Sequence, residues 1–145
     1  MERPVYRLTR LAALLLISAS GPATAAEPRW YTPQMVAAGK PFYQRHCSVC
    51  HGRAAEGNAA WRRPGPDGRY LPPPLDGSGH AWHHPRPLLG RIIVHGGVDG
   101  TGNMPAWGAV LDDGEVDAIL AWLQSRWPER VYNAWRDIDA RAAGR

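Results

Sequence analysis

The sequence predicts an all-α domain in which about three main helices are joined by long irregular loops. Apolar residues recur at helical spacing in three segments, each bounded by residues that favour helix ends. Two stretches between these segments are rich in glycine and proline, and no segment shows convincing strand alternation. The length of 145 residues suits a single domain.

The first two helices have recognisable ends. One is predicted over residues 33–46, with Thr32 as its N-cap and a proline at its first position. The other is predicted over residues 86–95, where Gly96 can end it.

The third helix has the clearest start. Asp112 and Glu115 form a capping-box pattern, and Pro128 ends the helix after Trp127. Its apolar residues recur on one helical face: Val116, Ile119, Leu120 and Leu123. The domain is therefore expected to span residues 26–127. The tail, residues 128–145, is predicted to form a short amphipathic helix that packs on it.

The glycine- and proline-rich stretch of residues 52–85 includes the run Pro72-Pro73-Pro74, which suits neither a helix interior nor a central strand. A loop of this length in a compact domain is usually functional, and wrapping a cofactor is one such function.

The N-terminus has the pattern of a secretory signal. Three arginines precede an apolar run over residues 11–19, and Ala23-Thr24-Ala25 forms a cleavage site. We expect residues 1–25 to be removed, which places the mature protein in the periplasm. The alternative is an uncleaved membrane anchor, although a spanning helix needs about 20 apolar residues. No membrane span is expected after cleavage.

The net charge of +4 does not indicate nucleic-acid binding. Half of the excess lies in the signal segment, and the remaining arginines are scattered rather than clustered on one predicted face. We therefore expect no nucleic-acid partner.

The two cysteines of the chain belong to the sequence Cys47-Ser48-Val49-Cys50-His51. Two thiols at this spacing can add across the vinyl groups of a haem, and the following histidine can bind the iron. Three alternatives explain the pair less well. A thioredoxin-like pair follows a strand, a zinc site needs four ligands, and a disulfide leaves His51 unexplained.

At these residues the chain resembles the class I, single-haem cytochromes c. The matching features are Gly39-Lys40-x-x-Tyr43, Cys47-x-x-Cys50-His51-Gly52, Pro74-Leu75, Met104-Pro105-Ala106-Trp107 and the amphipathic helix that follows. The resemblance covers roughly residues 33–127. It implies a small cytochrome c fold wrapped around one covalent haem c, with the first and last helices crossing at Gly39. Tyr43 and Trp122 or Leu123 would pack at that crossing.

The second axial ligand of the iron is expected to be Met104. In the resembling family this ligand is a methionine well beyond the haem motif, and Met104 lies in the second irregular stretch, just before a proline. Met35 lies on the first helix instead. The alternatives are that Met104 fills the core, or that a histidine replaces it on the iron. The candidate histidines are His80, His83, His84 and His95.

The resemblance also implies a haem pocket. A carbonyl group of Pro73 or Pro74 would orient the ring of His51, and Leu75 would lie against the haem face. Trp82 is a further candidate for the pocket, and the alternative is that it simply belongs to the core.

These residues predict one-electron transfer with His51 and Met104 as axial iron ligands, in a soluble periplasmic carrier or an electron-transfer subunit. The chain is then not an enzyme by itself, and its partners are redox proteins met transiently or in a complex. A haem sensor or enzyme with a labile or open sixth site is the alternative. A protein without haem, held by a Cys47–Cys50 disulfide, is the third hypothesis.

Overall fold

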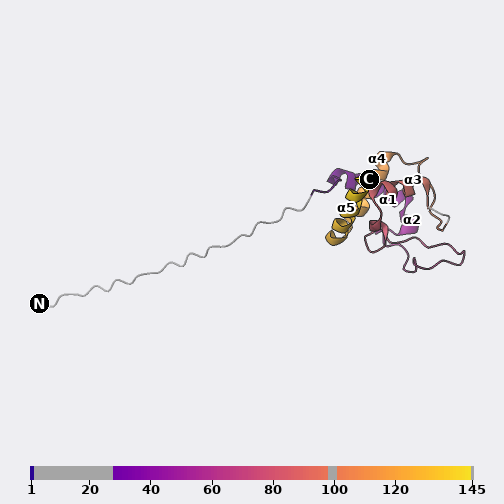
Figure 1. Cartoon of the computed structure of the whole chain (residues 1–145), viewed down its shortest axis with the longest axis horizontal. Helices are drawn as coiled ribbons and strands as arrows, with labels where there is room; N and C mark the ends of the chain where they lie inside the picture. Colours follow the sequence, from indigo (N-terminus) through magenta and orange to yellow (C-terminus); the bar gives the residue numbers. More distant parts are fainter. Residues whose placement is uncertain (2–27, 98–100, 145) are drawn as a thin grey trace.

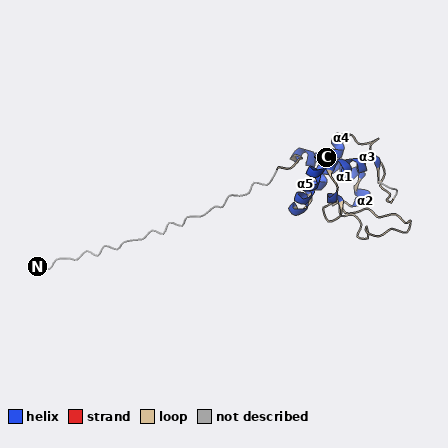
Figure 2. Ribbon diagram, viewed as in Figure 1, coloured by secondary structure: helices blue, strands red, loops and turns tan. Residues whose placement is uncertain are grey.

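The computed structural model describes residue 1 and residues 28–97 and 101–144. Within these ranges the chain forms helices and loops but no β-strand, as Figure 2 shows. Two isolated β-bridges join residues of the loops. The predicted all-α class is confirmed. The predicted signal segment lies outside the described residues apart from Met1. None of the described helices has the length and apolar character needed to cross a membrane.

Two of the helices match their predicted ends. Helix α1 (Pro33–His46) begins at Thr32, whose side chain accepts a hydrogen bond from the Met35 backbone N–H. Helix α3 (Arg86–His95) ends at Gly96, where the backbone φ of +86° favours glycine. Local capping chemistry therefore determines where both helices start and stop.

Helix α4 (Asp113–Ser125) begins with the predicted capping box, in which Asp112 and Glu115 exchange side-chain and backbone hydrogen bonds. It ends before Trp127, and Pro128 then precedes helix α5 (Glu129–Ala143). At 15 residues, α5 is longer than the short tail helix that was predicted. The prediction of three main helices was therefore incomplete, because α5 is a fourth.

Two shorter elements lie in the predicted loops. Helix α2 (Ser48–His51) follows α1 directly, and the 3-10 turn η1 (Ala81–His83) precedes α3. The remaining part of the long loop runs as an irregular arm along the lower side of the folded domain in Figure 1.

Helices α1 and α4 cross at close range. A Cβ atom added to Gly39 would lie only 1.9 Å from the Ala118 carbonyl oxygen, so the two backbones touch there. One turn along, the rings of Tyr43 and Trp122 pack with centroids 4.3 Å apart. This is the crossing that the family resemblance implied.

Buried side chains form two clusters. The first, called here the α1–α4 core, consists of Tyr43, Ala55, Ile93, Leu111, Val116, Ile119, Leu120, Trp122 and Leu123. The second, called here the α5 cluster, consists of Trp127, Val131, Tyr132 and Trp135. Trp30 packs against both clusters, which brings the start of the described chain between them.

Candidate functional site

The cysteine pair lies where α1 passes into α2. The Cys47 backbone N–H donates to the Tyr43 carbonyl, and the His51 N–H donates to the Cys47 carbonyl. Both cysteines are free thiols; Cys47 is half-buried and Cys50 is exposed. Burial, and then the charge of Cys50, raise the pKa of Cys47 to about 11. The two sulfurs and His51 are thus held on consecutive turns of one continuous backbone.

His51 is buried and has a fixed ring orientation. Its side chain is 8% exposed, and its Nδ1 lies 2.9 Å from the Pro73 carbonyl oxygen. Because a carbonyl oxygen can only accept, Nδ1 carries the hydrogen and Nε2 of the neutral ring keeps its lone pair. Burial lowers the pKa of His51, and the hydrogen bond to Pro73 opposes this. The neutral ring is the form that binds a metal.

The loop after α2 is folded tightly to bring Pro73 behind His51. Gly57 has a φ of +62°, and a Cβ there would lie 2.3 Å from the Pro74 nitrogen. The Leu75 N–H also donates to the Ala55 carbonyl over 2.8 Å. Pro73 thus occupies the position that the resemblance allowed for either proline, while Pro74 is buried beside it.

Leu75 lies between the two clusters. Its side chain is half-buried and packs against the α1–α4 core, and its carbonyl accepts a 2.8 Å hydrogen bond from the Trp127 indole. Trp82, in contrast, packs against the α5 cluster and contacts the His83 ring at a centroid distance of 3.7 Å. The structure therefore brings Pro73 to His51 and places Trp82 with α5.

Met104 is half-buried and packs against the α1–α4 core. Its carbonyl accepts a 3.0 Å hydrogen bond from the Gly97 N–H, just beyond α3. Further along, the Trp107 N–H donates to the Ile93 carbonyl over 3.0 Å. The Met104 segment is thus fastened to the end of α3 by backbone hydrogen bonds.

A hollow of about 410 Å³ lies beside Pro73 and Thr101, and neither cysteine, His51 nor Met104 lines it. Pro73, which holds His51, lines one part of it, and Thr101, shortly before Met104, lines another. The rest of its wall is aromatic, aliphatic and basic: Trp61, Arg62, Tyr70, Leu71 and His80. Two free thiols followed directly by a buried neutral imidazole are groups that fit a covalently attached haem, and the Met104 thioether, which packs against the same α1–α4 core as Cys47, is a candidate second iron ligand.

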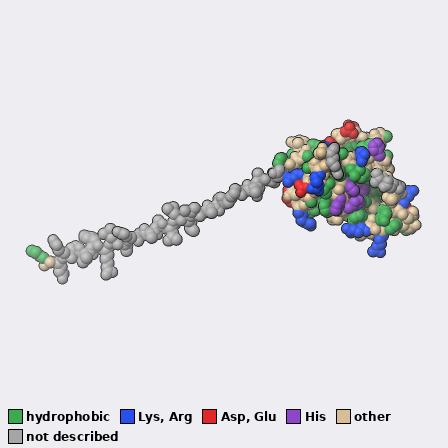
Figure 3. Space-filling model, in the orientation of Figure 1, with side chains coloured by type: hydrophobic (Ala, Val, Ile, Leu, Met, Phe, Trp, Pro, Cys, Tyr) green, Lys and Arg blue, Asp and Glu red, His purple; other side chains and the backbone are tan. Residues whose placement is uncertain are grey.

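The histidines that could compete with Met104 have other contacts. Figure 3 shows a group of histidine side chains on the face in view. The His80 ring stacks on Trp61 at 5.2 Å, and the His84 ring meets His80 edge-on at 5.5 Å. Burial lowers the pKa of both groups, and the charges of His84, His83 and Arg62 lower the pKa of His80 further.

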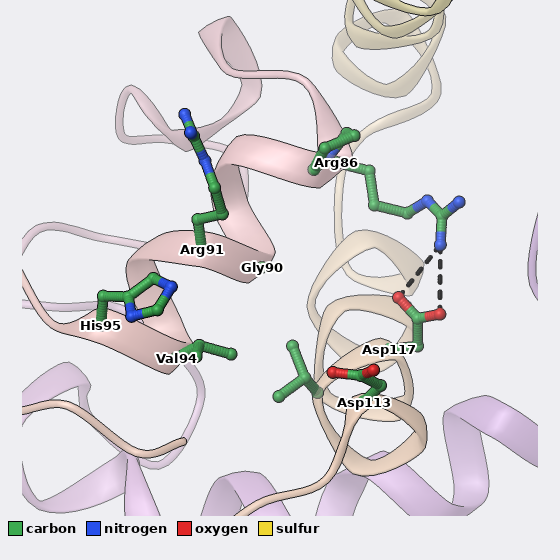
Figure 4. A pocket seen from close by; sticks show the side chains of 9 residues that line it. Arg86, Gly90, Arg91, Val94, His95, Asp113 and Asp117 are labelled. Carbon is green, nitrogen blue, oxygen red and sulfur yellow. Dashed lines mark hydrogen bonds and ion pairs between the residues drawn. The ribbon is translucent and has the colours of Figure 1, made fainter.

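A second hollow, of about 480 Å³, lies between α3 and α4 (Figure 4). His95 lines it, and Arg86 closes one end by reaching Asp117 at 3.0 and 3.1 Å. Like the first hollow, it is lined by neither cysteine, His51 nor Met104, and unlike the first it does not reach Pro73. No group of three or more His, Cys, Asp or Glu side chains able to hold a metal ion occurs in the described part of the chain.

Sequence reasoning did not identify Tyr70, Thr101 or Asn103 as residues near the site. They lie in two irregular segments far apart in the chain, and the Tyr70 N–H donates to the Thr101 carbonyl over 2.8 Å. Exposed polar residues in loops have no periodicity, so no sequence signal could have paired them.

Comparisons with known proteins identify a family for more than half of the chain. The family described as cytochrome c oxidase, cbb3-type, subunit III matches residues 34–123. The cbb3-type cytochrome c oxidase subunit CcoP of Azospirillum sp. (strain B510) is 31% identical over 90 residues. This match covers 62% of the present chain and only 28% of the relative. No solved structure gives a significant match.

Proposed function

The chain belongs to the c-type cytochrome family of the cbb3-type oxidase subunit III, and from this premise we propose that it transfers single electrons as a module of a larger redox assembly. Family membership confirms the resemblance noted in the sequence and implies haem c and electron transfer. The covalent attachment, the axial ligands and the partners are parts of the proposal.

The observation that carries the proposal is the setting of His51. A buried neutral imidazole follows two free thiols directly, and the Pro73 carbonyl holds its Nδ1 so that Nε2 is left to bind iron. A histidine with a purely structural role would need no pair of unbonded cysteines beside it.

Cys47 and Cys50 would each form a thioether by adding its S–H across one vinyl group of the haem. Exported cytochromes keep their cofactor through such bonds. The short helix α2 sets the thiols and His51 on adjacent turns, so attachment and ligation would act on the same edge of the group. Bound haem supplies the one-electron couple between ferric and ferrous iron.

Met104 would supply the sixth ligand. A thioether favours ferrous iron and raises the reduction potential, and two strong protein ligands leave the iron closed to small molecules. The half-buried position of Met104 in an irregular segment that is fastened to the end of α3 supports this role. A closed iron suits an electron carrier better than an oxygen catalyst.

Arg62 and His80 would face the haem carboxylates. Both line the hollow that adjoins Pro73, and the Arg62 guanidinium lies over the Trp61 ring, with its CZ carbon 4.3 Å from the centroid. A guanidinium is well suited to pair with a carboxylate.

The assembly is proposed to lie outside the cytoplasm, in keeping with the expected signal segment. The Azospirillum relative is a cbb3-type oxidase subunit, which favours a partner in a permanent redox complex over free diffusion. Its length beyond the match leaves room for regions with no counterpart in the present chain. The partner we propose is accordingly another haem protein that accepts electrons from this domain.

One experiment tests the site. The exported protein is reduced, and its visible spectrum is recorded before and after carbon monoxide. We expect an unchanged six-coordinate spectrum, whereas Met104→Ala should bind carbon monoxide and shift the potential downward by on the order of 100 mV, a fraction of the ~0.8 V that axial ligands span. Met35→Ala, a change to a half-buried methionine of α1, is the matched control.

Three outcomes would count against parts of the proposal. Absence of a haem adduct in the mass spectrum would refute attachment at Cys47 and Cys50. An unchanged spectrum in Met104→Ala would refute its ligation. Rapid and complete carbon monoxide binding by the unaltered protein would favour the sensor or enzyme with an open iron site.

A further inference from the structure

The tip of the long loop is joined to the segment that leads to Met104. Besides the hydrogen bond from the Tyr70 N–H to Thr101, residues Tyr70 and Gly102 form an isolated parallel bridge. The long arm at the lower side of the folded domain in Figure 1 therefore contacts the chain just before Met104. The two segments lie more than thirty positions apart in the sequence, as the separation of Arg69 and Asn103 (34) shows.

Three side chains close this junction, and we refer to Asp67, Arg69 and Asn103 as the clasp. The Asn103 Nδ2 donates to Asp67 Oδ2 over 2.9 Å, while its Oδ1 accepts from the Arg69 guanidinium. Asp67 Oδ1 in turn accepts a 3.0 Å hydrogen bond from the Arg69 backbone N–H. Each member thus contacts the other two.

The clasp is built to present an ionised carboxylate. The hydrogen bonds from the Arg69 backbone and the Asn103 amide lower the pKa of Asp67. The loop tip is also closed on itself, because the Gly65 N–H donates to the Arg69 carbonyl over 2.7 Å. Asn103 therefore binds to a tight turn that already presents the Asp67 carboxylate as acceptor and the Arg69 guanidinium as donor.

Met104 lies between two attachments. On one side the Gly97 N–H binds its carbonyl, and a Cβ on Gly96 would come within 2.9 Å of the same oxygen. On the other side stands the clasp, which ends at the residue directly before Met104. The hydrogen bond from Gly97 holds the main chain of Met104, and the clasp restrains the segment that directly precedes Met104.

We propose that the clasp is a positioning device that holds Met104 on the haem iron and so keeps the sixth coordination site closed. This inference rests on the proposed function. Asp67, Arg69 and Asn103 act through Met104, and none of them is a ligand or contacts the haem in this proposal.

The strength of the clasp follows from its exposure. All three side chains are exposed, so water competes for their hydrogen bonds and each contributes modestly. Breaking the clasp should raise the population of locally opened states without unfolding the core. Breaking the clasp is therefore expected to shift the equilibrium between bound and unbound Met104 at the iron, while the covalent attachment of the haem stays intact.

The test compares Asn103→Ala, which removes both side-chain bonds, with Arg69→Gln, which removes one donor. In the reduced protein the observed rate of carbon monoxide binding should rise by roughly three- to tenfold in Asn103→Ala, and by less in Arg69→Gln. In the oxidised protein the weak absorption band of methionine-bound ferric haem should decrease in the same order.

Two control variants match these changes. Asn133→Ala removes an exposed asparagine from α5, and Arg63→Gln removes an exposed arginine from the same long loop. Both should keep the wild-type binding rate and the methionine band. If the loss of any exposed polar side chain had this effect, the binding rate and the methionine band would change in the control variants as well.

The outcomes separate this inference from the proposed function. If the wild-type protein shows the methionine band and Asn103→Ala retains it with an unchanged rate, the clasp has no positioning role. If the wild-type protein carries haem without that band, the Met104 assignment is wrong and the clasp fails with it. Equal changes in Asn103→Ala and Asn133→Ala would also overturn the inference.

Discussion

The α1–α4 core and the α5 cluster are packed by different means. The core depends on direct backbone contact at Gly39, on one ring pair beside it (Tyr43 and Trp122) and on aliphatic side chains of α3 and α4. The α5 cluster depends on aromatic rings, with Trp127 and Tyr132 against Trp135 at centroid distances of 5.9 and 5.3 Å. Arg29 covers one edge of this cluster, because its guanidinium carbon lies 3.7 Å from the Tyr132 ring centroid.

The two regions differ in their relation to the family match. Residues 34–123 contain both cysteines, His51, Pro73 and Met104, whereas the four buried residues of the α5 cluster all follow that interval. Residues from both outside and inside the interval pack against the cluster: Trp30, Tyr31, Ala81, Trp82 and Leu89. The Trp30 indole donates to the buried Gln124 side chain over 2.5 Å, which ties the preceding flank to the following one. The residues proposed to hold the haem thus belong to the α1–α4 core or to the loops around it, while the flanking segments pack against the core from outside.

Gly39→Val should have the largest effect. The added Cβ would lie 1.9 Å from a backbone oxygen, which cannot swing aside as a side chain can. We expect α1 and α4 to separate, with a loss of about 4–5 kcal/mol or failure to fold. Urea unfolding measures the change, and Ala38→Val, at an exposed neighbouring position of α1, should cost only a few tenths of a kcal/mol, roughly the helix-propensity difference. Equal costs at the two positions would show that the crossing is not tight.

Trp135→Ala should come next and should affect only the α5 cluster. The side chain is 1% exposed, and its indole donates to the His84 carbonyl over 3.0 Å. Removal of a buried tryptophan costs about 3–4 kcal/mol. Amide hydrogen exchange should accelerate across α5 while α1 and α4 stay protected.

The haem spectrum provides the sharper part of this test. If the two regions are as separate as their packing indicates, Trp135→Ala keeps the six-coordinate spectrum. The exposed Arg130→Ala serves as the control on the same helix. A spectrum that changes with Trp135→Ala would mean that the Trp127–Leu75 hydrogen bond transmits α5 packing to the site.

Sequence reasoning worked where the structure is determined locally. Thr32, Gly96 and the Asp112–Glu115 capping box fixed three helices because a cap depends on neighbours within one turn. The Cys-x-x-Cys-His pattern is equally local, and it placed the candidate site before any tertiary contact was known. Gly39 was identified through the family resemblance rather than through its own spacing.

Non-local contacts could not be read in the same way. The length of α5 was underestimated, because its outer face is polar and its docking partner, Trp30, lies almost a hundred residues earlier. Trp82 lies in the short 3-10 turn η1, whose direction no periodicity in the sequence reveals, and it packs with α5. The clasp joins exposed polar residues, for which the sequence carries neither an apolar pattern nor a fixed spacing.

The smallest effect concerns the histidines where the two regions meet. His80 stacks on Trp61 beside the hollow, and the His84 carbonyl receives the Trp135 indole of α5. Burial lowers the pKa of both histidines from the ordinary value of 6.5. The unfolded chain therefore takes up protons first as the pH falls. The stability that these neutral rings contribute is fully present above pH 6.5 and is lost as the pH falls toward the lowered folded-state pKa.

Urea unfolding at about pH 7.5 and about pH 5.5, on either side of the ordinary histidine pKa, measures this loss. The wild-type midpoint should decrease at the lower pH, and the double variant His80→Gln/His84→Gln should show a smaller decrease. His95→Gln, at the exposed end of α3, should behave as wild type. Since the His84 backbone carries the bond to α5, the decrease should appear first as faster exchange in α5. If the urea midpoint of the double variant decreased as much as that of the wild type, the pH-sensitive groups would lie elsewhere. His80 and His84 would then contribute nothing to the pH dependence of stability.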